Sequence, residues 1–139
     1  MSATWPEGLG QSKCVLLTTF TRDGRPKPTP VWFTLDGERL LVYTEPGSWK
    51  VRRLRHTPQV RVRACTLRGR PTGPEVEARA RLLDEQEAQA VLRAVLGRYP
   101  VAGRFFRLTT RLSRARTELL RHPAGIEVVL PGTARPATA

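Results

Sequence analysis

The residues with the clearest chemical potential lie in the stretch TEPGSWKVRRLR, at positions 44–55, where a β-like run gives way to a helix-like one. A helix that begins near Gly47 or Ser48 would expose unpaired backbone N–H groups and the positive end of its dipole. Thr44 and Ser48 can add hydroxyl donors, and Lys50 adds a positive charge in the first turn. This combination favours an anion-binding site, for which phosphate is the best-suited ligand.

Lys50 stands where a cation gains little from the helix itself. Cations stabilise helix C-termini, and near an N-terminus they are mildly unfavourable unless an anion is bound there. Arg53, three residues later, can reach the same region, while Val51 and Leu54 are expected to point inward. The alternative, a capped helix with a solvated basic face, stays open.

A second signal is the stretch PTPVWF at positions 28–33. Its two prolines remove backbone donors, so the segment is expected to form a sheet edge or a bulge. Trp32 and Phe33 point to opposite faces of a strand, so one can enter the core while the other covers a ligand or a second subunit. Two core aromatics are the alternative.

The sequence offers few groups for acid–base or nucleophilic chemistry. His56 stands two residues before Pro58 and His122 directly before Pro123, and the two histidines lie far apart in the sequence. No nucleophile elbow, phosphate-binding glycine loop or pair of carboxylates in an apolar setting is present. We therefore expect no metal and no catalytic side chain, and a bound cofactor would carry any reaction.

The elements that position these residues are mostly strands. Strands are expected at 14–20, 29–35, 38–44, 59–65, 75–83 and 125–131, the first three forming a meander with a hairpin turn at Asp36–Gly37. If the fourth and fifth strands pair, arginines of one can face glutamates of the other. A capping box of Asp84 and Glu87 predicts a helix over 84–99. Another helix is expected at about 101–120.

This order predicts one domain over residues 1–139, with flexible ends at 1–10 and 131–139. Six mostly antiparallel strands favour a small β-barrel with helices packed outside. No apolar run approaches the ~20 residues that span a bilayer, and no secretory leader is apparent. Cys14 and Cys65 show no metal spacing, so we expect two free buried thiols in a cytoplasmic protein.

The formal net charge of +12 would attract nucleic acid, an anionic membrane, or phosphorylated and carboxylated small molecules. No signature of a common RNA- or DNA-binding module accompanies the charge, and no basic run is interleaved with aromatics. A basic nucleic-acid-binding module is therefore only a distant alternative, and no membrane partner is expected.

Taken together, the motifs Thr-Pro-Val-Trp-Phe, the Asp-Gly hairpin, Tyr-Thr, Gly-Ser-x-Lys and Arg-x-Leu-Arg-x-x-Pro resemble the flavin- and deazaflavin-binding split-barrel proteins related to pyridoxamine phosphate oxidase. The likeness covers about residues 10–85 and is strongest to the small actinobacterial branch of F420-dependent oxidoreductases. It implies a six-stranded antiparallel split β-barrel that forms a two-fold homodimer, with the cofactor ring in a groove at the subunit interface.

The resemblance also implies roles for particular residues. The strand TPVWF would offer backbone groups to the ring, and the turn after the Tyr-Thr motif would hold the phosphate, with nearby arginines in the same basic cluster. The implied cofactor-binding residues are Pro30, Val31, Trp32, Thr44, Ser48, Trp49, Lys50, Arg53 and Arg55.

One departure from the family pattern matters. Pyridoxamine phosphate oxidases proper carry a basic residue on the strand that is PTPVWF here, and this chain has no cation there after Lys27. Their C-terminal basic substrate site also has no counterpart. Oxidation of pyridoxamine phosphate is therefore not predicted.

The expected cofactor is coenzyme F420, with FMN as the alternative and a tetrapyrrole-like ligand or no redox ligand still open. The deazaflavin carries a phosphodiester and a polyglutamate tail, which a basic track would suit. That track could be Arg52 and Arg55 with the stripe Arg104, Arg107, Arg111 and Arg114, although a solvated helix face is the simpler explanation of the stripe.

The expected function is hydride transfer between the reduced deazaflavin and an unidentified small unsaturated substrate. An FMN-dependent oxidoreductase or flavin reductase of the same fold is the main alternative, and a non-catalytic cofactor carrier is another. Tyr43 and Tyr99 are conceivable proton donors, but nothing else in the sequence supports them.

Overall fold

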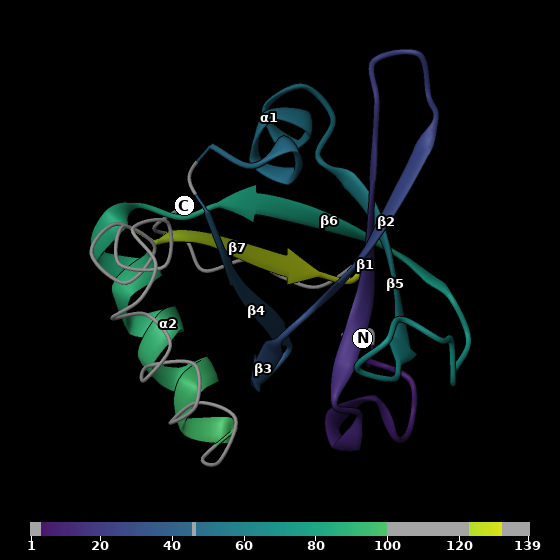
Figure 1. Ribbon diagram of the computed structural model, residues 1–139, viewed down its shortest axis with the longest axis vertical. Coiled ribbons are helices and arrows are strands. Elements are labelled where there is room, and N and C mark those ends of the chain that lie inside the picture. Colours follow the sequence, from purple (N-terminus) through teal and green to yellow (C-terminus); the bar gives the residue numbers. More distant parts are fainter. Residues whose placement is uncertain (1–3, 46, 100–122, 132–139) are drawn as a thin grey trace.

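The computed structural model describes residues 4–45, 47–99 and 123–131, and in it an antiparallel sheet curls into a half-barrel (Figure 1). The strands are β1 (Cys14–Phe20), β2 (Pro26–Val31), β3 (Phe33–Asp36), β4 (Arg39–Thr44), β5 (Gln59–Cys65), β6 (Val76–Leu82) and β7 (Ala124–Val129). The helices are the short 3₁₀ turn η1 (Leu9–Gln11), α1 (Trp49–His56) and α2 (Glu85–Arg98). The predicted mainly β, split-barrel class is confirmed.

The sheet order is β2-β1-β5-β6-β7-β4-β3, so the two edge strands are neighbours in the chain. The expected single strand over 29–35 is wrong: it is broken at Trp32, and the sheet therefore has seven strands instead of six. The predicted three-strand meander is wrong for the same reason, because β2 pairs with β1 while β3 pairs with β4. The prolines do mark an edge, as predicted, since β2 ends the sheet.

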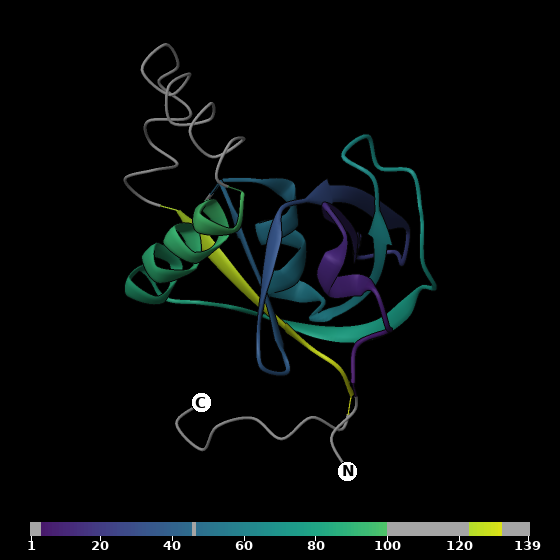
Figure 2. The ribbon, with the colours of Figure 1, turned by 90° about the horizontal axis from the view of Figure 1, so that it is seen from below.

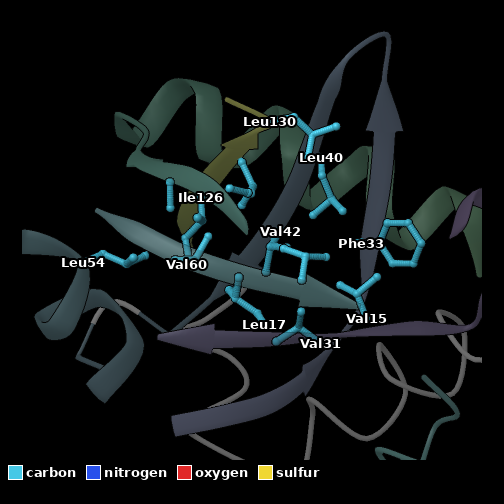
Figure 3. Packing of buried hydrophobic residues seen from close by; sticks show 14 of the residues in the cluster. Val15, Leu17, Val31, Phe33, Leu40, Val42, Leu54, Val60, Ile126 and Leu130 are labelled. Carbon is cyan, nitrogen blue, oxygen red and sulfur yellow. The ribbon is translucent and has the colours of Figure 1, made fainter. Parts of the chain in front are cut away.

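The core lies inside the curl, where alternate side chains of the strands meet (Figure 3). Phe33 is fully buried there, so it is the core aromatic of the Trp-Phe pair. Trp32 points the other way and stacks on Tyr99, with ring centroids 4.8 Å apart. Core side chains labelled in Figure 3 are Val15, Leu17, Val31, Phe33, Leu40, Val42, Leu54, Val60, Ile126 and Leu130.

Helix α2 packs outside the sheet against β3, β4 and β7 (Figures 1 and 2). Its predicted cap is confirmed, because the Glu87 N–H donates to Asp84 Oδ1 at 2.8 Å. The face predicted to be apolar is buried throughout. Gly125 of β7 permits close approach, since a Cβ there would lie 3.0 Å from the Cα of Ala88.

Arg98 joins the end of α2 to two other segments, the N-terminal segment and the start of β3. Its guanidinium donates to the carbonyl oxygens of Phe33 (2.8 Å), Gly10 (2.6 Å) and Ser12 (2.8 Å). The same group lies over the Phe33 ring, 4.1 Å from its centroid. Arg98 therefore joins the N-terminal segment, the start of β3 and α2 without any carboxylate partner among the described residues.

The predicted charge pairing between β5 and β6 is confirmed in part. Arg61 lies opposite Glu77 in register and forms a long, exposed ion pair with Glu75 at 3.7 Å. Such a pair contributes little to stability. Arg63 instead donates to the carbonyl oxygen of Gly73 at 3.0 and 2.9 Å.

Cys14 and Cys65 are buried and free, as predicted, and face each other in the register of β1 and β5. Burial raises the pKa of both thiols, that of Cys65 to about 11, so they are protonated at neutral pH. Within the described residues, no helix is long and apolar enough to cross a membrane, and no group of His, Cys, Asp or Glu could hold a metal ion. The helix expected at about 101–120, with its arginine stripe, lies outside the described residues.

Candidate functional site

The predicted phosphate turn lies between β4 and α1. Ser48 caps the helix, as its Oγ accepts a hydrogen bond from the Val51 N–H at 3.4 Å. The Thr44 hydroxyl donates to the same oxygen at 3.4 Å, so the two predicted hydroxyl residues are in contact. Because the Ser48 oxygen accepts in both bonds, its own hydroxyl hydrogen is left to donate to a ligand.

Lys50 follows the cap by two residues, and its side chain is half-buried. Burial lowers the pKa of its ammonium group; Glu45 opposes this change, whereas Arg53 adds to it. The protein therefore keeps a partly desolvated cation beside a second cation and the positive end of a helix dipole. An anion bound between them would offset all three costs.

Arg53 connects this turn to the first strand. Its guanidinium donates to Oγ1 of Thr19 at 3.3 Å, and Thr19 is fully buried in β1. The Arg53 side chain is thereby held on the same flank of α1 as Lys50, as the predicted i, i+3 spacing requires.

Next to the turn, α1 and the β1–β2 hairpin enclose a hollow of about 460 Å³, which we call the basic hollow. Figure 1 shows this arrangement, with the hairpin projecting beside α1. The hollow is lined by Phe20, Thr21, Arg22, Trp49, Arg52, Arg53 and His56. The hairpin residues among these were not predicted, because no local pattern reveals that the end of β1 lies against a helix about thirty residues later.

Arg55 is separated from the other predicted cations. It lines a different hollow of about 340 Å³ with Val51 and the residues that precede α2. Arg53 and Arg55 were expected to belong to one basic cluster, but they line different hollows. Residues two apart on a helix differ in direction by about 200°, so their side chains point to nearly opposite sides of α1.

The three predicted ring-side residues have different environments. Pro30 is exposed on the outer face of β2, Val31 is in the core and Trp32 is stacked on Tyr99. Only β1 pairs with β2 among the described residues, so one side of the β2 backbone lacks a strand partner. That open edge is where backbone groups could meet a flat ligand.

The Tyr99 hydroxyl makes a structural hydrogen bond, which favours a structural role over the proton-donor role considered from the sequence. Its hydroxyl donates to the carbonyl oxygen of Lys13 at 2.5 Å. Burial raises the pKa of this phenol, which keeps it protonated and hydrogen-bonded. The site that emerges is a cationic, hydroxyl-bearing turn between β4 and α1, and its described residues include no acid–base pair joined by a hydrogen bond.

Comparison with known proteins gives a family match and solved structures with a similar fold. The family described as pyridoxamine 5'-phosphate oxidase matches residues 1–129. No curated protein matches the chain by sequence. The fold is similar to that of a conserved hypothetical protein from Mycobacterium tuberculosis, with 19% identity, a TM-score of 0.65, and 99% of this chain and 97% of that one covered.

Two further solved structures share the fold. One is an FAD-binding protein from Mesorhizobium loti, with 18% identity, a TM-score of 0.58, and 88% of this chain and 82% of that one covered. The other is an F420 reductase, with 19% identity, a TM-score of 0.52, and coverage of 93% and 97%. At these identities the likeness shows a shared fold.

Proposed function

The chain belongs to the pyridoxamine 5'-phosphate oxidase family, and we propose that it is an oxidoreductase that uses coenzyme F420 to reduce a small unsaturated substrate. The observation that carries this proposal is the half-buried Lys50 at the start of α1, beside the Ser48 hydroxyl and Arg53. A partly desolvated cation in that position is best explained by an anionic group that binds there. The likeness to an F420 reductase supports the choice of cofactor.

When bound, the deazaflavin would supply the hydride, because no side chain of the described site is equipped to do so. The tasks of the chain are to bind and to orient. Ser48 and Lys50 hold the phosphate, and Thr44 positions Ser48 through the bond between their hydroxyls. The open edge of β2 at Pro30 and Val31 gives the ring backbone contacts. The stack of Trp32 on Tyr99 holds the chain at the break between β2 and β3, where this edge strand ends.

We further propose that two copies of the chain form the groove for the ring, as the resemblance implies. Helix α2 packs on β3, β4 and β7 and α1 contacts β1, so neither of these described helices packs closely on the edge strand β2. A second copy placed there would exclude water from the ring and hold the substrate over it.

The test is a pair of fluorescence titrations of the purified protein with F420 and with FMN, followed by turnover of reduced F420 with a panel of unsaturated acceptors. We expect tight F420 binding and oxidation of the reduced cofactor by at least one acceptor. Tight binding of FMN alone would assign the flavin instead, in line with the likeness to an FAD-binding protein. Tight F420 binding without turnover would identify a carrier, and binding of neither would reject the proposal.

A further inference from the structure

The basic hollow has a composition that the phosphate turn does not explain. Four of its seven lining residues come from one face of α1, and three come from the end of β1 and the turn after it. Trp49 is 66% exposed, which is rare for so large an apolar side chain. Lys50, the central residue of the phosphate turn, is not part of the lining.

The hollow gathers positive charge that the protein does not neutralise. Arg22, Arg52 and Arg53 all line it, and none of them forms an ion pair with a carboxylate in the described part of the chain. The nearest acid in sequence, Asp23, is instead paired with Arg25 at 3.0 Å. Three guanidinium groups that share one concavity repel each other until an anion enters.

His56 holds one of these cations in place. Nη2 of Arg22 lies 2.9 Å from Nε2 of His56. A guanidinium can only donate hydrogen bonds, so this imidazole nitrogen must be the acceptor. Arg22, although it lies on an exposed turn, is thereby fixed against α1 at the rim of the hollow.

The lining of the hollow also includes two large aromatic side chains, Phe20 and Trp49. The Arg52 guanidinium lies 5.0 Å from the centre of the Trp49 ring, and Arg61 approaches the Phe20 ring at 5.3 Å. A ligand ring could stack on the indole while its acidic group pairs with a guanidinium. An aliphatic or inorganic anion would use the cations and leave the rings without a role.

We propose that the basic hollow, which borders the phosphate turn and shares Arg53 with it, is a binding site for a small aromatic carboxylate. A hollow of about 460 Å³ lies within the range of small-molecule sites. The proposal does not depend on the cofactor, because its charges and rings are in place in the chain alone.

The test is isothermal titration calorimetry of the full chain, without cofactor, against 2-naphthoate, its neutral amide and inorganic phosphate. We expect naphthoate to bind at least about tenfold more tightly than the amide or phosphate, since only naphthoate has both a charge and a ring. Arg22→Ala and Arg52→Ala should each weaken naphthoate binding about fivefold or more. Trp49→Ala should weaken it, and Trp49→Phe should restore most of the affinity.

The matched control is Arg25→Ala, which removes a cation from the same hairpin but outside the lining. It should leave naphthoate affinity within about twofold, as expected for an exposed, paired charge. An equal loss in Arg25→Ala, equal binding of phosphate and naphthoate, or the absence of naphthoate binding would each overturn the proposal. Lys50→Ala distinguishes this proposal from the proposed function, because it should weaken the binding of F420 and FMN while naphthoate still binds.

Discussion

At the scale of single residues, Lys50 is the position where the two interpretations of the basic helix differ. If α1 were only a capped helix with a solvated face, its ammonium group would be free to extend into water. Instead it is half-buried beside Arg53. Lys50→Ala should therefore weaken binding of a phosphorylated cofactor by about 1–3 kcal/mol, the contribution of a charge-assisted contact.

The measurement for Lys50→Ala is a fluorescence titration with F420 and FMN. Arg93→Ala is the control, because Arg93 is an exposed cation on α2, and its loss should leave affinity unchanged. If Lys50→Ala and the unmodified chain bound F420 and FMN with equal affinity, the assignment of this turn as the phosphate site would be rejected.

The same lysine predicts a pH dependence. Its pKa is lowered, so the ammonium form that binds phosphate is lost at a lower pH than for an ordinary lysine. Cofactor affinity should therefore fall as the pH rises through this lowered value. In Lys50→Arg the guanidinium stays charged over this range, and the fall should disappear. Identical alkaline profiles for the two proteins would show that Lys50 does not hold the anion.

Glu127 is a residue whose importance is structural. Its carboxylate is 1% exposed and accepts hydrogen bonds from Arg39 and Arg81, each at 3.1 Å. Burial alone would raise its pKa, but the bonds from Arg81 and Arg39 outweigh burial, and the pKa is lowered. The ionised form therefore stabilises the fold above the pKa of the unfolded chain, and this stability is lost as the pH falls through the folded pKa.

Glu127→Gln should lower the free energy of unfolding by about 3 kcal/mol at neutral pH, because it leaves two arginines without their shared partner. The variant should also show a flatter loss of stability in acid. Urea denaturation between pH 3 and pH 7 measures both effects. If the stability of Glu127→Gln and of the unmodified chain changed in parallel with pH, the structural role of the ionised Glu127 would be contradicted.

At the scale of elements, α2 depends on a glycine in a strand. A Cβ at Gly125 would lie 3.0 Å from the Ala88 Cα and 3.1 Å from its Cβ, so the helix would have to shift. Gly125→Ala should destabilise the protein by about 1–3 kcal/mol. Gly97→Ala in α2 is the matched control, because nothing lies within 4 Å of its Cβ position; it should stabilise by about 0.5–1 kcal/mol. Thermal unfolding distinguishes the two, and equal melting temperatures would refute the packing argument.

Elements set by neighbouring residues could be predicted from the sequence. The Asp84 cap and the turn at Asp36–Gly37 depend on a few adjacent side chains, and both are where the pattern placed them. The break at Trp32 could not be predicted. It accompanies a stack on Tyr99, a residue 67 positions later, and the Arg98 bond to the Phe33 carbonyl. Tertiary contacts of this kind override a local strand preference.

One part of the candidate region could be predicted from neighbouring residues, and the other part could not. The phosphate turn lies within residues 44–53, so its spacing was visible in the sequence. The basic hollow needed the pairing of Arg22 with His56, 34 positions apart. Nothing local to either residue indicates that contact.

At the scale of the whole molecule, the proposed homodimer makes cofactor binding depend on assembly. We expect analytical ultracentrifugation to show a dimer, and cofactor affinity to fall when dilution separates the subunits. The net charge of +12 opposes association at low salt, so the dimer should tighten as salt is added. A monomer that binds F420 with undiminished affinity would show that one subunit forms the whole site.

The pairing of β4 with β7 has a consequence for how the protein is made. Leu41 lies opposite Glu127, so the partner of β4 is synthesised 86 residues after it. At about 5–20 residues per second, the ribosome leaves β4 waiting several seconds with only β3 beside it. During that time Leu40 and Val42, which are fully buried in the finished sheet, are exposed on the nascent chain. Rapid translation or chaperone capture of this early hairpin should therefore decide how much of the protein escapes aggregation.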